Sequence, residues 1–367
     1  MKINTGLQVA ALTTAAALLA AGCSSNKTAT PPSSAGGSSP AATGGSASGG
    51  GGGGLIGEDY PRSDSDFWNA YIKYVPQMAS TLGVTIKTTN SQNDITKLAA
   101  NAEALVAQGA KALVLAPQDT AAVKPTLDKM EAAKIPVVTI DTEPDAGKVF
   151  MIVRADNRAY GEKSCKYIGD TLKGVGNVVM FEGDLASVNG RDRTEAFNSC
   201  MKQNYPNIKV FGEATKWDPP TAIGQLDTVL AGNKINAIYM QASIYLSATL
   251  QDLQGKGLLK PRGQAGHIVI VSNDGVAAEY KAIKDGSMDA AVSQPADLYA
   301  KYGLFYAQQA LAGKTFAEGK TDHDSTITKV AAGNLEDQLP APLVTVDGAY
   351  PGSLKVDDPS LWGNQAG

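Results

Sequence analysis

The sequence predicts an α/β protein with two doubly wound domains, each a parallel sheet covered by helices. From residue 55 onward, short and nearly continuous apolar runs alternate with longer helical stretches. Strands that are apolar throughout are typical of parallel sheets buried on both faces. The chain has 367 residues, enough for two domains of about 150 residues each. The apolar runs are too many for one sheet, so we expect two.

The expected strands are the short apolar runs at 55–60, 84–89, 112–116, 136–140, 149–153, 177–181, 209–214, 237–240, 267–271 and 289–292. The expected helices lie between them at 66–82, 95–107, 121–133, 159–172, 191–204, 221–231, 244–254, 277–284 and 298–311. In the first helix, apolar residues from Phe67 to Leu82 recur on one stripe, as in an amphipathic helix. Pro76 and Pro125 lie inside helical stretches, where we expect kinks or shorter helices.

The first 54 residues are not expected to join the folded body. Residues 1–22 carry one lysine, an apolar stretch and small residues before Cys23, which is a secretory signal in outline. The run LAAGC at 19–23 resembles the lipobox of bacterial lipoproteins, which implies cleavage before Cys23 and a lipid on that cysteine. The alternative is an ordinary signal peptide with a chance cysteine. Residues 23–54, rich in Ser, Gly, Ala, Thr and Pro, are expected to form a flexible linker.

Composition and charge argue against several classes of function. The net charge of −4 is unlike that of a nucleic-acid binder, which has a basic face. With 2 His and no paired CxxC, the common zinc frameworks are excluded, and we expect neither a metal nor a cofactor. Cys165 and Cys200 lie on consecutive expected helices of the second domain. Outside the cytoplasm they either form a disulfide or remain two buried free thiols.

Polar residues follow nearly every apolar run, in both halves of the chain. They are Gln118, Asp119, Asp141, Asp156, Asn157, Gln241, Asn273, Asp274 and Gln294. In open α/β sheets, ligands bind beyond the carboxyl ends of the strands. Any one of these residues could instead cap a helix or form a turn. Their recurrence in both halves predicts two sheet edges that face a shared ligand cleft.

The residue types at these positions suit a ligand with several hydroxyl groups. Carboxylates and amides each bind two neighbouring hydroxyls, and arginine offers a rigid fork of donors. Phe67, Trp68 and Trp217 could stack on the apolar face of a sugar ring. For Phe67 the alternative is a core position, because it shares the apolar stripe of its helix.

Residues 55–346 resemble the periplasmic-type sugar-binding proteins of ABC importers, the ribose-binding-like group with the type I fold. The resemblance is strongest at KIPVVTID (134–141), ADN (155–157), GRDRTEAF (190–197), SNDG (272–275) and AIKDG (282–286) through Gln294. It implies hydroxyl binding by Asp141, Arg193, Asp274 and Gln294, and stacking by Phe67, Trp68 and Trp217. Gln118, Asn157 and Gln241 complete the expected ligand-binding set from the strand ends.

Three positions depart from the pattern of ribose-binding relatives. Ala116 and Ala242 stand where those relatives usually have a pocket asparagine, and Thr142 replaces the arginine that commonly follows the aspartate. Each change removes hydrogen-bond donors, and a buried hydroxyl left unpaired costs about 1–3 kcal/mol. We therefore expect a sugar or polyol bound otherwise than ribose, with a less polar small molecule as the alternative.

The resemblance also implies a three-strand hinge, with the chain crossing between domains near 155–157, 294–297 and 323–326. The N-terminal lobe would then be 55–156 plus 297–324, and the C-terminal lobe 157–296 plus 325–350, followed by a tail at 351–367. We expect a monomeric binding protein, not an enzyme, which captures its ligand by closure and delivers it to ABC permease subunits. It would lie outside the cytoplasm, anchored to the cell membrane by the lipid on Cys23. The alternative function is a sensor that presents ligand to a membrane receptor or kinase.

Overall fold

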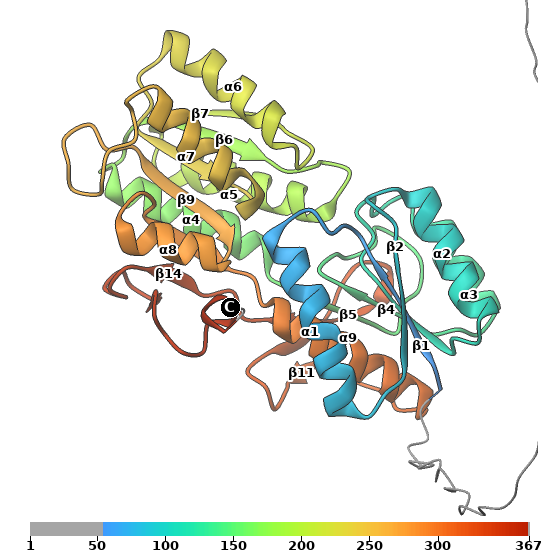
Figure 1. The fold of residues 1–367 in the computed structure, drawn as a ribbon. Coiled ribbons are helices and arrows are strands. Elements are labelled where there is room, and N and C mark those ends of the chain that lie inside the picture. The colour runs from blue at the N-terminus through green and yellow to red at the C-terminus, as the bar shows by residue number, and fades with distance from the viewer. Residues whose placement is uncertain (1–53, 366–367) are drawn as a thin grey trace, which may run out of the picture. The chain divides into compact units, whose positions relative to one another are not determined.

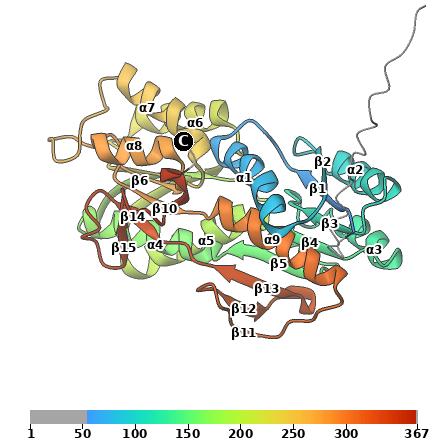
Figure 2. The same cartoon turned by 60° about the horizontal axis from the view of Figure 1, so that its bottom comes forward.

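The computed structural model describes residues 54–365, which fall within one compact unit of the chain. Their strands form two sheets, and helices cover both faces of each sheet (Figures 1 and 2). We call the first sheet with its helices lobe 1 and the second sheet with its helices lobe 2. The predicted α/β class with two doubly wound sheets is confirmed. The predicted signal peptide, Cys23 and linker up to residue 53 lie outside the described residues.

The sheet of lobe 1 has the order β11-β12-β13-β5-β4-β3-β1-β2. Its strands are β1 (Ile56–Tyr60), β2 (Ile86–Asn90), β3 (Ala112–Leu115), β4 (Val137–Ile140), β5 (Met151–Ala155), β11 (Gly319–Lys320), β12 (Thr326–Lys329) and β13 (Leu335–Leu339). Neighbours from β2 to β13 are parallel, and β12 and β11 add an antiparallel edge. Its helices are α1 (Asp66–Leu82), α2 (Ile95–Ala107), α3 (Lys124–Ala132) and α9 (Ala296–Leu311).

Both faces of the central strand β3 are buried, which explains why this strand is apolar throughout. In β3, Val114 packs into the core that includes α1 and α9, whereas Leu113 and Leu115 pack into the core that includes α2 and α3. Successive side chains of a strand point to opposite faces of the sheet. A strand that is covered on both faces therefore buries all of its side chains, which favours apolar residues.

The sheet of lobe 2 has the order β15-β14-β10-β9-β8-β6-β7. Its strands are β6 (Val175–Glu182), β7 (Asn207–Ala214), β8 (Ala237–Met240), β9 (Val269–Asp274), β10 (Ala290–Ser293), β14 (Leu343–Thr345) and β15 (Ser353–Lys355). Helices α4 (Asn157–Thr171) and α5 (Val188–Asn204) contribute to one core, and the core of the other face takes in α6 (Pro219–Gly232), α7 (Leu246–Gly255) and α8 (Ala277–Asp285). Short 3-10 turns lie at Ser243–Tyr245, Ala331–Gly333 and Trp362–Asn364.

Helix α1, which later proves to border the site, is fixed at both ends by local chemistry. The Ser65 side chain accepts a hydrogen bond from the backbone N–H of Trp68 at 3.3 Å, and Gly83 ends the helix with a φ of 66°. Of the two expectations for Pro76, a shorter helix is wrong, because α1 runs through Pro76 and keeps its full length of 17 residues. Pro125 lies in the first turn of α3, where proline is tolerated.

The chain passes between the two sheets three times. The first two passages, between β5 and α4 and between β10 and α9, match the expected positions. The third differs: β12 and β13 still belong to the sheet of lobe 1, and β14 is the next strand in lobe 2. The passage therefore lies between Leu339 and Leu343, not at 323–326, because β13 pairs in parallel with β5. Among residues 54–365, none of the helices has the length and apolar character that a membrane span requires.

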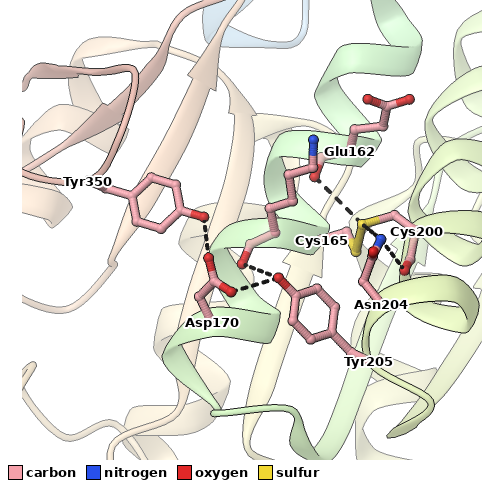
Figure 3. Close-up of a disulfide and its surroundings, with 8 residues drawn as sticks. Glu162, Cys165, Asp170, Cys200, Asn204, Tyr205 and Tyr350 are labelled. Atoms are coloured by element: carbon pink, nitrogen blue, oxygen red, sulfur yellow. Dashed lines mark hydrogen bonds between the residues drawn. A yellow bond between two sulfur atoms is a disulfide. The ribbon is translucent and has the colours of Figure 1, made fainter.

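A disulfide joins Cys165 on α4 to Cys200 on α5, so the first of the two alternatives for these cysteines is correct (Figure 3). Next to it, the Asp170 carboxylate accepts hydrogen bonds from the Tyr205 and Tyr350 hydroxyls, both at 2.7 Å. Tyr350 comes from the C-terminal part of the chain. The bridge and the tyrosine pair together tie both helices and that segment to one face of lobe 2.

We predict that reducing this disulfide lowers the free energy of unfolding by about 3–4 kcal/mol, because the bridge closes a loop with a sequence separation of 35 and restricts the unfolded chain. Urea unfolding with and without reductant measures the change. The variant C165A/C200A is the control, since reductant should not alter its midpoint. Equal stability of the wild type in both conditions would contradict the prediction.

Candidate functional site

A cavity lies between the two lobes, where the carboxyl ends of both sheets meet. The space between its walls is about 450 Å³, a figure that includes the open solvent at its mouth. Residues from both lobes line it: Arg62, Ser65, Phe67, Trp68, Gln118, Asp141, Asn189, Arg193, Trp217, Ala242, Ile244, Asp274 and Gln294. A ligand in this space would therefore contact both lobes at once.

The Arg193 guanidinium, from α5, is buried and each of its three nitrogens donates a hydrogen bond. Nε donates to Asn157 Oδ1 at 2.6 Å, Nη1 to the Gln241 carbonyl at 2.5 Å, and Nη2 to Gln294 Oε1 at 2.6 Å. Its Cζ lies 4.8 Å from the centre of the Tyr160 ring. These contacts fix the position of the positive charge at the cavity wall.

The Asp141 carboxylate, at the end of β4, takes hydrogen bonds from lobe 2. Oδ1 accepts from Gln294 Nε2 at 2.8 Å, and Oδ2 accepts from Asn189 Nδ2 at 3.1 Å. Burial raises the pKa of Asp141 to about 6; the charges of Arg193 and Arg154 oppose this rise. Asp141 is therefore close to its titration range near neutral pH.

The Asp274 carboxylate, at the end of β9, is the second acid of the cavity. Its Oδ2 accepts hydrogen bonds from Ser243, from the backbone N–H at 2.8 Å and from the hydroxyl at 2.7 Å. Burial raises the pKa of Asp274, and the positive charge of Arg193 acts in the opposite direction. The cavity thus places one carboxylate from each lobe near a single buried guanidinium.

Aromatic side chains border the cavity from both lobes. Phe67 and Trp68 lie in the first turn of α1 and meet edge to face, with ring centres 5.2 Å apart. Trp217 lies in a turn of lobe 2 with a φ of 57°, and its ring lies so close to Gly183 that a Cβ there would come within 2.0 Å of it. The buried Nε1 of Trp217 has no hydrogen-bond partner within the described part of the chain.

The structure brings eight of the ten predicted ligand-binding residues to the cavity wall. They are Phe67, Trp68, Gln118, Asp141, Arg193, Trp217, Asp274 and Gln294. Asn157 and Gln241 do not line the cavity. They accept hydrogen bonds from the Arg193 guanidinium instead. The side chain of Gln241 turns into lobe 2, where Oε1 accepts from Gly183 N at 2.9 Å and Nε2 donates to Thr194 Oγ1 at 2.7 Å.

Four residues of the cavity wall were not predicted from the sequence, namely Arg62, Ser65, Asn189 and Ile244. Arg62 and Ser65 follow β1, so the rule that polar residues after a strand bind ligand would have found them. Asn189 lies in the first turn of α5, which begins three residues earlier than predicted. Of the three departures from the ribose-binding pattern, Ala242 lines the cavity, whereas Ala116 and Thr142 do not. Residues 54–365 contain no group of three His, Cys, Asp or Glu side chains placed to hold a metal ion.

Comparison with known proteins agrees with this geometry. The family model described as "Periplasmic binding protein domain" matches residues 59–315. The chain belongs to this family. A ribose import binding protein of Bacillus subtilis is 26% identical over 260 residues, which is 71% of this chain and 82% of that protein. A xylitol-binding protein of Mycolicibacterium smegmatis is 23% identical over 252 residues, 67% of this chain and 68% of that protein.

Solved structures of two binding proteins share the fold. A galactofuranose binding protein superimposes with a TM-score of 0.69 at 23% identity, covering 80% of this chain and 95% of its own. An ABC transporter solute binding protein from Bacillus halodurans C-125, solved with bound myo-inositol, has a TM-score of 0.70 at 19% identity and covers 82% and 97%. The resemblance to type I sugar-binding proteins stated from the sequence is confirmed, and the family consists of binding proteins.

We predict that D141N gains stability relative to the wild type as the pH rises from 4 to 7. The folded protein holds the Asp141 proton more tightly than the unfolded chain does, so this carboxyl contributes stability that is present at about pH 4 and is lost as the pH rises through about 6. Asparagine cannot ionise, so it escapes this loss.

The difference in unfolding free energy between D141N and the wild type should therefore grow by about 2 kcal/mol between pH 4 and pH 7. Urea unfolding at both pH values measures it, with D128N on the exposed face of α3 as the matched control. A constant difference across this range would show that Asp141 is not a buried acid.

Proposed function

We propose that the protein captures a neutral sugar or polyol in the inter-lobe cavity by hinge closure and delivers it to an ABC importer. The observation that carries the proposal is the position of Asp141, Asp274, Arg193 and Gln294 around one cavity bordered by aromatic rings. Carboxylates and amides accept hydrogen bonds from vicinal hydroxyls, and the guanidinium donates to their oxygens. Aromatic rings add flat apolar surface for the C–H face of a ring-shaped ligand.

The charges of the cavity disfavour an anionic ligand. Two carboxylates, Asp141 and Asp274, face the buried guanidinium of Arg193, whereas Arg62 at the wall pairs with Asp64. Burying an uncompensated charge costs several kcal/mol, so an anion placed beside the two carboxylates would bind poorly. Relatives named for ribose, for xylitol and for galactofuranose support a small neutral polyhydroxyl compound as the ligand class.

The ligand should be bound otherwise than ribose is in the ribose-binding group. Ala242 presents only a methyl group to the cavity, at a position where an amide usually donates to a pentose hydroxyl. Trp217 also lines the cavity, and its buried indole N–H has no hydrogen-bond partner among residues 54–365. We infer a ligand whose oxygen accepts from this N–H and whose less polar part lies against Ala242.

The proposal of hinge closure rests on the fact that both lobes contribute residues to the cavity wall. Asp141 and Phe67 belong to lobe 1, and Arg193 and Asp274 belong to lobe 2, so a ligand that contacts all four stabilises only the closed arrangement. We propose that this closed form is what the permease recognises. We further propose that the protein acts outside the cytoplasm, as a lipoprotein anchored through Cys23, with residues 24–54 as its tether.

A thermal-shift screen followed by calorimetry tests the proposal. The panel contains D-ribose, D-galactose, L-arabinose, D-fructose, xylitol and myo-inositol. A ligand that binds only the native state must raise its apparent stability. We expect at least one panel member other than ribose to raise the melting temperature in a concentration-dependent way. If no neutral sugar or polyol stabilises the wild type, the proposed ligand class is wrong.

For the panel member that binds, we predict that D274N weakens affinity about tenfold to hundredfold. The substitution keeps the shape of the side chain and an oxygen that can accept from Ser243, but it removes a charged acceptor for ligand hydroxyls. Calorimetry gives the dissociation constant. D227N, an exposed position on α6, is the matched control and should bind like the wild type. Unchanged affinity in D274N would remove Asp274 from the site.

A further inference from the structure

Two neighbouring residues of α5 carry opposite charges, and each meets the opposite charge on lobe 1. Arg191 pairs with Asp145, and both side chains are about one-third exposed, at 38% and 35%. Asp192 accepts a hydrogen bond from Arg154 Nη2 at 2.7 Å, and this pair is more deeply buried, at 22% and 4%. Each lobe therefore contributes one positive and one negative side chain to the boundary between the lobes. None of the four residues lines the ligand cavity.

The lobe 1 partners are held firmly in place. Asp145 accepts a hydrogen bond from the Thr120 hydroxyl at 2.9 Å, and its backbone N–H donates to the Thr120 carbonyl at 2.9 Å. Arg154 Nη1 donates to Glu143 at 3.0 Å, and a further carboxylate oxygen, from Glu336, lies 3.7 Å from the same nitrogen. Contacts within lobe 1 alone therefore hold the charged groups of Asp145 and Arg154 in position.

Asn189 connects these ion pairs to the cavity. Its Oδ1 accepts from Arg154 Nη2 at 3.2 Å, and its Nδ2 donates to Asp141 at 3.1 Å. One side chain of α5 therefore contacts both the ligand-facing carboxylate and the buried arginine of lobe 1. The polar wall of the cavity and the ion pairs behind it form one continuous network.

We propose that Arg191–Asp145 and Asp192–Arg154 form an inter-lobe latch that stabilises the closed form without ligand and so sets ligand affinity. Each pair joins one lobe to the other, so its stabilisation is present only while the lobes are together. Contacts made in one state alone shift the population toward that state, and ligand then binds to a larger competent fraction. The latch rests on the proposed hinge closure but not on the identity of the ligand.

The four latch residues should act as positioning residues that can be changed without unfolding either lobe. When Asp192 loses its charge, Arg154 keeps Glu143 and Glu336 as partners within lobe 1, so its charge remains compensated. Glu195 offers a matched control on the same helix. It pairs with Arg158, and both residues belong to lobe 2 and are exposed, at 67% and 47%.

The test measures the lobe-to-lobe distance in ligand-free, full-length protein. Spin labels are attached at A100C on α2 and T228C on α6, two exposed positions on different lobes, in a C23S background. Pulsed electron paramagnetic resonance then gives the ratio of closed to open molecules. The variants are D192N, D145K, the charge swap D145K/R191E, and the control E195Q.

We expect D192N to lower the ratio of closed to open molecules about tenfold and D145K to lower it at least threefold. The charge swap should raise the ratio again relative to D145K, and E195Q should match the wild type. A merely structural role would not be rescued by exchanging two charges. The latch is overturned if D192N and D145K leave the distance distribution unchanged, or if the ligand-free wild type is fully open. Because no ligand is added, a failed sugar screen and a failed latch remain distinguishable.

Discussion

The site depends on one physical constraint, the burial of the Arg193 guanidinium where the two lobes meet. A charge removed from water must be compensated by hydrogen bonds and by opposite charge. Asn157, the Gln241 carbonyl and Gln294 accept its hydrogen bonds, and the carboxylates of Asp141 and Asp274 supply the negative charge. Asn157 and Gln241, which do not line the cavity, are therefore needed to keep its central cation in place.

The same constraint explains why the two lobes act together. Asp141 reaches lobe 2 through hydrogen bonds from Gln294 and Asn189, so closing the lobes completes the surroundings of a buried acid. Burial raises the pKa of Asp141 to about 6, and that destabilisation near neutral pH is a property of a site prepared for a ligand. A hydroxyl-bearing ligand that donates to this carboxylate would relieve part of the cost.

The sequence was sufficient for the class of fold and for most of the cavity, because buried parallel strands are apolar and their carboxyl ends carry the polar residues. Asp141, Asp274 and Gln294 follow directly from that rule. The same rule did not predict β11, β12 and β13, because these strands are short and contain polar residues. The third passage between the sheets was therefore placed too early in the chain. It could not separate Gln241 from the true wall residues, because residues after a strand turn either into the cavity or into the lobe, and only packing decides which.

A crystal structure of the protein with the sugar or polyol that stabilises it most would test the central claim directly. The account predicts one molecule enclosed between the lobes, with hydroxyl oxygens within hydrogen-bond distance of Asp141, Asp274 and Arg193 and one ring face against an aromatic side chain. Electron density for the ligand at any other place, with these three side chains still bonded only to protein groups, would contradict it.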